Sequence, residues 1–94
     1  MKKETYYIVR ADRAGVFFGQ IESKTKESVV MTGVRKIHYW DGACAVEQIS
    51  QTGVNNNSRV TVVVPKMEIA DPIQIIECTE SATDNLLKQK EWKQ

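Results

Sequence analysis

The stretch Arg-Lys-Ile-His-Tyr-Trp-Asp-Gly-Ala-Cys-Ala, residues 35–45, contains the change from strand to helix that decides the predicted fold. Asp41 is a favourable N-cap residue, because its carboxylate can accept hydrogen bonds from the free amides of a first helical turn. Gly53 suits the residue after a helix, where a left-handed conformation is wanted. The stretch therefore predicts a strand over residues 34–40, followed by a helix over residues 42–52.

The predicted strand over residues 34–40 has no uniformly apolar face. Alternation places two sets of side chains on opposite sides: Val34, Lys36, His38 and Trp40 on one, and Arg35, Ile37 and Tyr39 on the other. Each set mixes polar and apolar groups. We therefore expect this strand at a sheet edge, or lining a cleft or a subunit interface.

Two strand patterns at the start of the chain predict an antiparallel hairpin. Residues 5–10 and 16–22 are rich in aromatic and β-branched residues and flank a turn. Gly19 inside the second pattern predicts a bulge or a close approach by another backbone. Phe17 and Phe18 point to opposite faces, so we expect one in the core and the other free for an interface or a ligand.

The second half of the chain continues the strand pattern and ends in a helix. Residues 59–64 give the strongest strand signal, typical of a buried central strand. Residues 66–69 fit a short edge strand after a proline, and residues 73–78 form another strand. Ser81 resembles the start of a capping box, which predicts a helix over residues 82–90.

The predicted elements define the fold class. With a further short strand over residues 28–32, they total five to seven strands and two short helices, and the short connections favour antiparallel pairing. We expect an α+β fold: a small β-dominated domain of mostly antiparallel strands with two short helices. The 94 residues fit a single domain over residues 1–94. A core this small favours assembly into a homo-oligomer.

The composition of the chain limits the binding partners and the cellular compartment that we expect for it. Thirteen Lys and Arg against twelve Asp and Glu leave a net charge of +1, which argues against binding a long nucleic acid. Cys44 and Cys78 belong to no Cys/His cluster, so we expect no metal site and free thiols. No apolar run approaches the ~18 residues of a membrane span, and the first residues are not those of a signal peptide. We expect a cytoplasmic protein.

Enzyme motifs are absent from the sequence. It contains no GxSxG, no HExxH, no phosphate-binding loop and no dinucleotide fingerprint. His38 stands beside Tyr39 and Asp41 and could act as a general base, but neighbours on a strand alternate between faces. A half-exposed strand histidine is the simpler interpretation. We expect no catalysis and no cofactor.

A ligand-binding hypothesis and a structural hypothesis both fit the aromatic and basic residues. Aromatic rings stack on nucleic-acid bases, and guanidinium groups bind phosphate oxygens in bidentate fashion. The candidate ligand-binding residues are Arg10, Arg13, Arg35, Lys36, His38, Tyr39 and Trp40. The alternative is that the Tyr-Trp pair fills the core or a subunit interface, where both residue types are common.

Three stretches in order resemble a family of small uncharacterised proteins carried by bacteriophages and prophages. They are residues 8–19, residues 34–43, and residues 73–77 with the Ser/Thr-rich segment that leads towards Trp92. The most specific part is an (R/K)-x-x-Y-W-D-G-A element. The family has Arg-Arg-Leu-Trp before the Tyr-Trp pair, and this chain has Arg35 followed by Lys-Ile-His. His38 therefore stands where that family has an indole.

The resemblance implies an accessory protein of a phage, acting in the host cytoplasm. Small phage proteins of this kind often act against host defence, and some sequester nucleotide immune signals without cleaving them. The resulting hypothesis is a homo-oligomeric protein that sequesters a small nucleotide-type signal, such as a cyclic nucleotide or a cyclic ADP-ribose isomer. The alternative is a structural or host-protein-binding phage protein without a small-molecule ligand.

Overall fold

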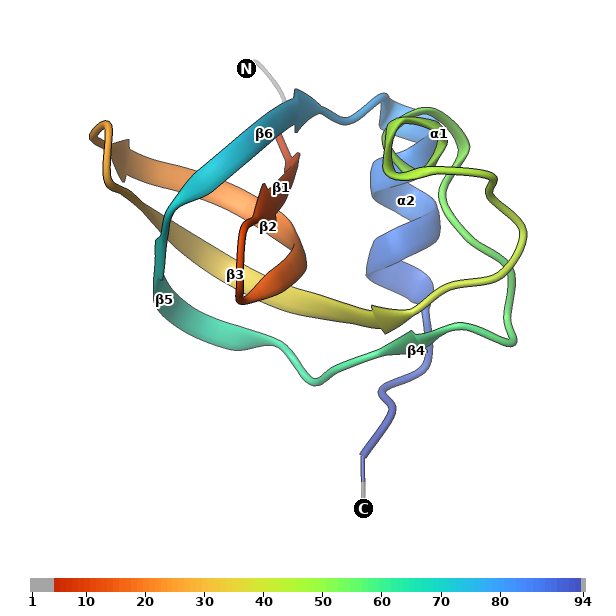
Figure 1. Ribbon diagram of the computed structural model, residues 1–94. Helices are drawn as coiled ribbons and strands as arrows, with labels where there is room; N and C mark the ends of the chain where they lie inside the picture. The colour runs from red at the N-terminus through yellow and green to blue at the C-terminus, as the bar shows by residue number, and fades with distance from the viewer. Residues whose placement is uncertain (1–4, 94) are drawn as a thin grey trace.

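The computed structural model describes residues 5–93, so residues 1–4 and 94 of the predicted domain lie outside the described residues. The elements follow in chain order: β1 (Tyr7–Ala11), β2 (Gly15–Lys24), β3 (Ser28–Tyr39), α1 (Val46–Thr52), β4 (Arg59–Val60), β5 (Val64–Ala70), β6 (Pro72–Glu77) and α2 (Glu80–Lys88). The pairings among β1 to β6 are all antiparallel. The predicted α+β class is confirmed, and both helices lie on one side of the strands (Figure 1).

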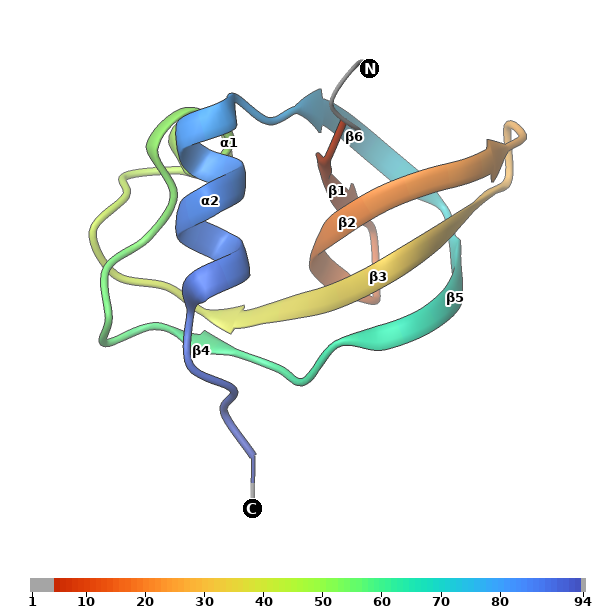
Figure 2. The same cartoon turned by 180° about the vertical axis from the view of Figure 1, so that it is seen from behind.

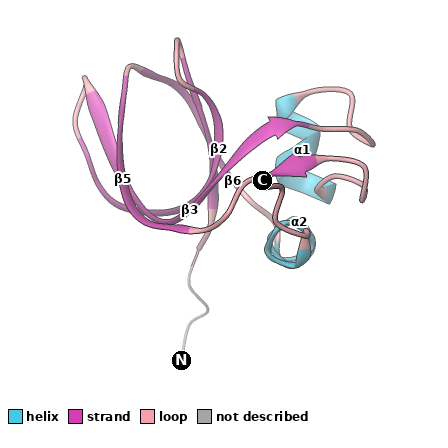
Figure 3. Ribbon diagram, turned by 90° about the horizontal axis from the view of Figure 1, so that it is seen from below, coloured by secondary structure: helices cyan, strands magenta, loops and turns pink. Residues whose placement is uncertain are grey.

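The sheet curls into a small barrel. Its order is β4-β3-β2-β1-β6, and β5 pairs with β3 on the same edge as β4. β5 continues through Asp71 into β6, which links the β3 edge to the β1 edge and closes the ring seen in Figure 3. Asp71 makes this turn with a φ of 55°, a conformation that Asp tolerates better than most residues. Its amide donates to the Glu27 carbonyl, and its carbonyl accepts from the Asp12 amide.

Two apolar cores occupy the two faces of this sheet. The barrel interior consists of strand residues alone: Val9, Ala11, Phe17, Val29, Met31, Val34 and Ile69. The other core lies between the outer face of the barrel and the helices, and it includes Ile8, Phe18, Ile37, Ile49, Val60 and Leu86. The view from behind in Figure 2 shows α2 standing against this outer face. Because both faces are covered, Phe17 and Phe18 are both buried, and the expectation that one would be free was wrong.

The segment with the strongest strand signal is mostly not a strand. β4 contains only Arg59 and Val60, and the chain leaves the ladder until Val64. Thr61 explains the departure, because its hydroxyl accepts from the Lys36 amide (2.9 Å) and its amide donates to the Lys36 carbonyl (3.0 Å). Val62 and Val63 are exposed, so the predicted buried central strand was wrong.

The first helix is shorter than predicted. α1 begins at Val46, and its N-cap Ala45 offers no side-chain hydrogen bond. The Asp41 carboxylate accepts instead from the Gly42 amide (3.0 Å) and the Asn55 side-chain amide (3.2 Å), which stabilises the loop before the helix. Asp41 is therefore not the N-cap. Gly53 does end the helix, with a φ of 81°.

The second helix begins two residues earlier than predicted, at Glu80. The N-cap is Thr79, whose hydroxyl accepts from the Ala82 amide (3.0 Å), so Ser81 does not start a capping box. Within residues 5–93, no helix is both long and apolar enough to cross a membrane.

Candidate functional site

Arg35 is the largest fully buried side chain among the described residues, with 2% of its surface exposed. Its guanidinium donates to three backbone carbonyls: Thr61 (2.9 Å), Leu86 (2.7 Å) and Val60 (3.5 Å). Burial lowers the pKa of Arg35, and the nearby Glu91 partly offsets this effect. The predicted phosphate contact does not fit this geometry, because the donors of Arg35 are directed at the backbone.

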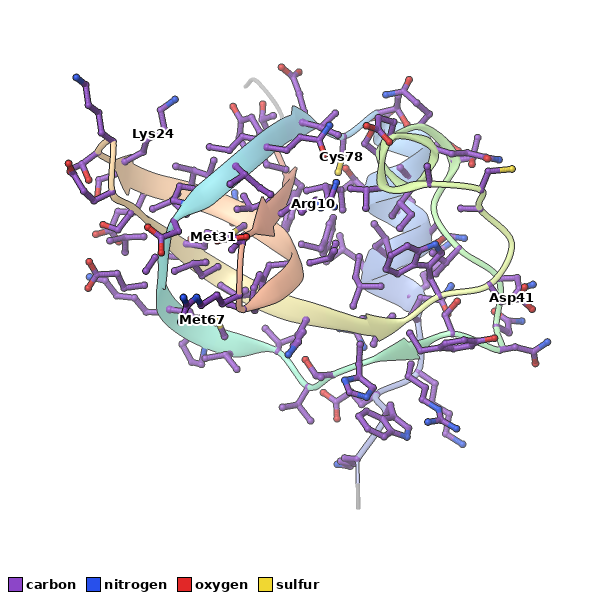
Figure 4. All side chains as sticks on the ribbon, in the orientation of Figure 1. Arg10, Lys24, Met31, Asp41, Met67 and Cys78 are labelled. Atoms are coloured by element: carbon purple, nitrogen blue, oxygen red, sulfur yellow. The ribbon has the colours of Figure 1, made fainter. Side chains whose placement is uncertain are left out.

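Four other candidate residues lie in four different surroundings and do not form one ligand-binding surface. Trp40 packs, half-buried, against the core beneath the helices. The Lys36 ammonium lies over the Phe17 ring, 6.0 Å from its centroid. Arg13 is exposed in the turn between β1 and β2. Arg10 is exposed on β1, well apart from the C-terminal segment in Figure 4.

Arg10 belongs to a polar group on the α1 side of the barrel. The Gln74 side chain donates to the Glu47 carboxylate (2.9 Å), and this bond lowers the pKa of Glu47, with a smaller contribution from the charge of Arg10. Arg10 and Arg35, both candidate ligand-binding residues, therefore do not meet at one binding surface.

The two remaining candidates, His38 and Tyr39, lie at the exposed end of β3 beside Arg59 and Trp92. The rings of His38 and Trp92 stack with centroids 4.7 Å apart and planes 14° apart. The Arg59 guanidinium carbon lies 5.5 Å from the centroid of Trp92 and 5.8 Å from that of Tyr39. We call these four residues the aromatic-basic cluster.

Local backbone pairing places three members of the aromatic-basic cluster, Tyr39, Arg59 and Trp92. Tyr39 is the register partner of Arg59, which places the guanidinium beside the phenol. Trp92 follows α2, and its amide donates to the Val60 carbonyl (2.8 Å) while Glu91 forms a parallel bridge with Val60. The segment after α2, residues 89–93, therefore extends the sheet beyond β4.

A shallow hollow of about 260 Å³ adjoins the cluster. Its walls are the loop before β4 and residues 89–93, and the lining side chains are Asn56, Ser58, Lys90, Glu91, Trp92 and Lys93. Lys93 forms an ion pair with Glu91 (3.4 Å). Trp92 is shared by the hollow and the cluster, so aromatic faces and cationic groups border one accessible surface.

The cluster can bind through its rings and charges. Tyr39 is 50% exposed and Trp92 is 41% exposed, so both offer ring surface to a second molecule. Aromatic faces stack on planar rings, and a guanidinium can bind both an anion and a ring face. Within residues 5–93, no group of three or more His, Cys, Asp or Glu side chains is close enough together to hold a metal ion.

The two cysteines differ in environment. Cys44 is exposed and Cys78 is buried, and both are free thiols. Burial, with a contribution from Glu77, raises the pKa of Cys78 to about 12. Cys78 therefore stays protonated at neutral pH and is a poor nucleophile.

Sequence reasoning missed Arg59 and placed Trp92 outside the site. Arg59 begins the segment predicted to be a buried strand, residues 59–64, and Trp92 is not among the candidate ligand-binding residues. One feature of the sequence could have identified Arg59 as a surface residue. It begins a strand pattern directly after an Asn-rich turn, and turns lie at the protein surface.

A family model described as a domain of unknown function, DUF6948, matches residues 4–86. The chain therefore belongs to this family. Searches of curated proteins and of solved structures returned no match. Three cluster residues, His38, Tyr39 and Arg59, lie within the matched residues, and Trp92 lies beyond them.

Proposed function

We propose that this protein binds a small nucleotide-type ligand at the aromatic-basic cluster and holds it without chemical change. A planar base would lie against the exposed rings of Tyr39 and Trp92. The anionic part would meet Arg59 and, across the hollow, Lys90. The observation that carries the proposal is the guanidinium of Arg59 beside two exposed rings, at 5.5 and 5.8 Å.

The charges around the hollow favour an anion. Lys93 is paired with Glu91, which neutralises that pair, whereas Arg59 over the Trp92 ring and Lys90 in the lining of the hollow add positive charge. Two cations and two rings match a ligand that carries both a base and a phosphate. The hollow lies near the lower limit of the ~300–1,000 Å³ typical of ligand pockets, which favours a small ligand or one shared between copies.

The biological part of the proposal is sequestration of a host immune signal by a phage protein in the host cytoplasm. It is supported by the resemblance of the (R/K)-x-x-Y-W-D-G-A element to phage and prophage proteins, and by the absence of any enzyme motif from the sequence. Cyclic nucleotides and cyclic ADP-ribose isomers are the ligand classes to test first. A homo-oligomer would place several clusters on one particle and raise its capacity.

The direct test is a thermal-shift panel of the purified protein with mononucleotides, cyclic dinucleotides and cyclic ADP-ribose isomers. A ligand at 100 times its Kd stabilises the folded state by about 2.7 kcal/mol. For a domain of this size, that raises Tm by about 10 °C or more. No shift with any compound at millimolar concentration would refute the proposal.

Paired variants locate the site. Arg59→Ala should abolish the shift, because it removes the cation beside both rings. Arg13→Ala removes another exposed arginine, outside the cluster, and should leave the shift intact. Equal loss in both variants would indicate non-specific attraction of an anion. Intact ligand, recovered after heat denaturation and identified by mass spectrometry, would confirm binding without cleavage.

A second candidate is a protein-binding surface, and one observation favours it. His38 and Trp92 already stack on each other, so each ring offers only its outer face. Trp, Tyr and Arg are also the residue types most enriched among interface hot spots. A host protein retained stoichiometrically by the wild type and lost on Trp92→Ala, with no nucleotide effect on Tm, would select this candidate.

A further inference from the structure

The contacts of Arg35 connect the segments that carry the aromatic-basic cluster. The residue is on β3, four positions before Tyr39, and its guanidinium donates to carbonyls of Val60, Thr61 and Leu86. Val60 and Thr61 follow Arg59 directly. Leu86 lies in the last turn of α2, from which residues 89–93 emerge.

Arg35 and Trp92 bind the same backbone group. The Val60 carbonyl accepts from the Trp92 amide (2.8 Å) and from Arg35 (3.5 Å). The bond from Arg35 to Leu86 (2.7 Å) fixes the helix end only a few residues before Trp92. A cation near the last carbonyls of a helix is also favoured by the helix dipole. The Arg35 side chain thus binds the segment from α2 to Trp92 at its start, through the Leu86 carbonyl, and at its end, through the Val60 carbonyl that also binds the Trp92 amide.

The contact also has an electrostatic side. Glu91 lies close enough to raise the pKa of Arg35 against the effect of burial, so the carboxylate next to Trp92 is attracted to the buried guanidinium. A guanidinium supplies several donors in a fixed plane, whereas an ammonium is a point charge on a flexible stem. Lysine could therefore reproduce the charge of Arg35 but not its three separate carbonyl contacts.

We propose that Arg35 is a positioning residue for the ligand site: it sets the place of Trp92 against His38 and Arg59 and does not itself touch the ligand. This assignment rests on the proposed function only where ligand affinity is concerned. The position of Trp92 can be measured without any ligand. A result that refutes the positioning role of Arg35 can therefore be told apart from a result that refutes nucleotide binding.

The first experiment uses proton NMR on Arg35→Met, which keeps an apolar stem at the site. We expect loss of the nuclear Overhauser contacts between the Trp92 indole and the His38 imidazole, with the Trp40 indole signal unchanged. Arg35→Lys should give a partial loss. Arg13→Met is the matched control and should change nothing. Retained contacts between Trp92 and His38 in folded Arg35→Met would overturn the proposal.

A second measurement covers the case in which Arg35→Met does not fold. In the wild type, the Nε proton of Arg35, bonded to the Thr61 carbonyl, should exchange with solvent at least 100-fold more slowly than the Nε proton of exposed Arg13. Equal exchange rates would overturn the assignment. With 5′-AMP as the probe, folded Arg35→Met should bind at least tenfold more weakly than wild type. Wild type without AMP binding removes the proposed function for this probe and leaves the NMR result to decide the role of Arg35.

Discussion

The two halves of β3 are stabilised in different ways. Residues 28–34 pair with β2 on one edge and β5 on the other, and apolar side chains such as Met31 fill the barrel interior. Residues 35–39 pair with β2 only at Arg35 and Lys36, pair with two residues of β4 on the other edge, and are further held by the polar contacts of Arg35. The comparison teaches that apolar packing stabilises the barrel half, whereas the other half buries Ile37 beside a charged Arg35 and ends in a ring exposed next to a cation.

The largest effect should come from the barrel half. Met31→Ala removes a fully buried side chain from the barrel interior and should lower the free energy of unfolding by about 2–5 kcal/mol. The Trp92 indole signal should not move, because Met31, labelled in Figure 4, packs in the core of the barrel interior, to which Trp92 does not belong. Chemical denaturation and NMR measure both quantities. A shifted Trp92 signal in folded Met31→Ala would show that the two halves are coupled.

The Asn85 side chain connects α2 to the backbone that follows α1, and its substitution tests this contact. Its side chain accepts from the Val54 amide and donates to the Val54 carbonyl, both at 2.9 Å. Asn85→Ala leaves the Val54 amide without its partner, while the Val54 carbonyl keeps the Gln89 side-chain amide (3.3 Å), and should cost about 1–3 kcal/mol in urea denaturation. Asn56→Ala, at an exposed loop position, should cost less than about 0.5 kcal/mol. An equal loss of unfolding free energy in Asn85→Ala and Asn56→Ala would show that the Asn85 bonds to Val54 do not stabilise the fold.

The cap of α2 should have a smaller effect. Thr79→Ala removes the hydroxyl that accepts from the Ala82 amide and donates to the Gln51 carbonyl (2.7 Å). The expected loss of stability is about 1 kcal/mol. Thr79→Ser keeps the hydroxyl and should recover most of it. The thermal midpoints of the two variants separate these outcomes.

The smallest effect at neutral pH concerns the thiols. Native protein should show one thiol reactive to Ellman's reagent, from exposed Cys44, and two after denaturation. Because the pKa of Cys78 is raised to about 12, the unfolded thiol ionises first once the pH exceeds about 8.5. Stability should therefore fall as pH rises above that value, and less steeply in Cys78→Ala. Two reactive thiols in the native state would contradict the burial of Cys78.

Sequence patterns predicted the barrel half well. The strands β1, β2 and β6 alternate or carry dense β-branched residues, and each formed close to its predicted range. Gly19 was expected to mark a bulge or a close approach, and it does both. The register shifts there, and an added Cβ would lie 3.0 Å from the Thr32 carbonyl oxygen. Local periodicity suffices where burial on a regular ladder decides the structure.

The site half could be predicted only in part. His38 and Tyr39 were recognised as candidates, but the partners of Arg35 are backbone carbonyls, which carry no mark of residue type. A buried arginine and an exposed arginine therefore look alike in sequence. The apolar run over residues 62–63 misled in the opposite direction, because side-chain type alone does not show where a chain leaves its ladder.

The two tryptophans provide the most direct test of ligand binding at the aromatic-basic cluster. In a ¹⁵N NMR titration with 5′-AMP, cyclic dinucleotides and cyclic ADP-ribose isomers, the Trp92 indole N–H should shift in a saturable manner. The indole N–H of Trp40, which packs against the core, should stay in place. A saturable shift of Trp92 alone, lost in Arg59→Ala, is the result that we expect. Static signals for every compound at millimolar concentration, or a shift confined to Trp40, would contradict the account.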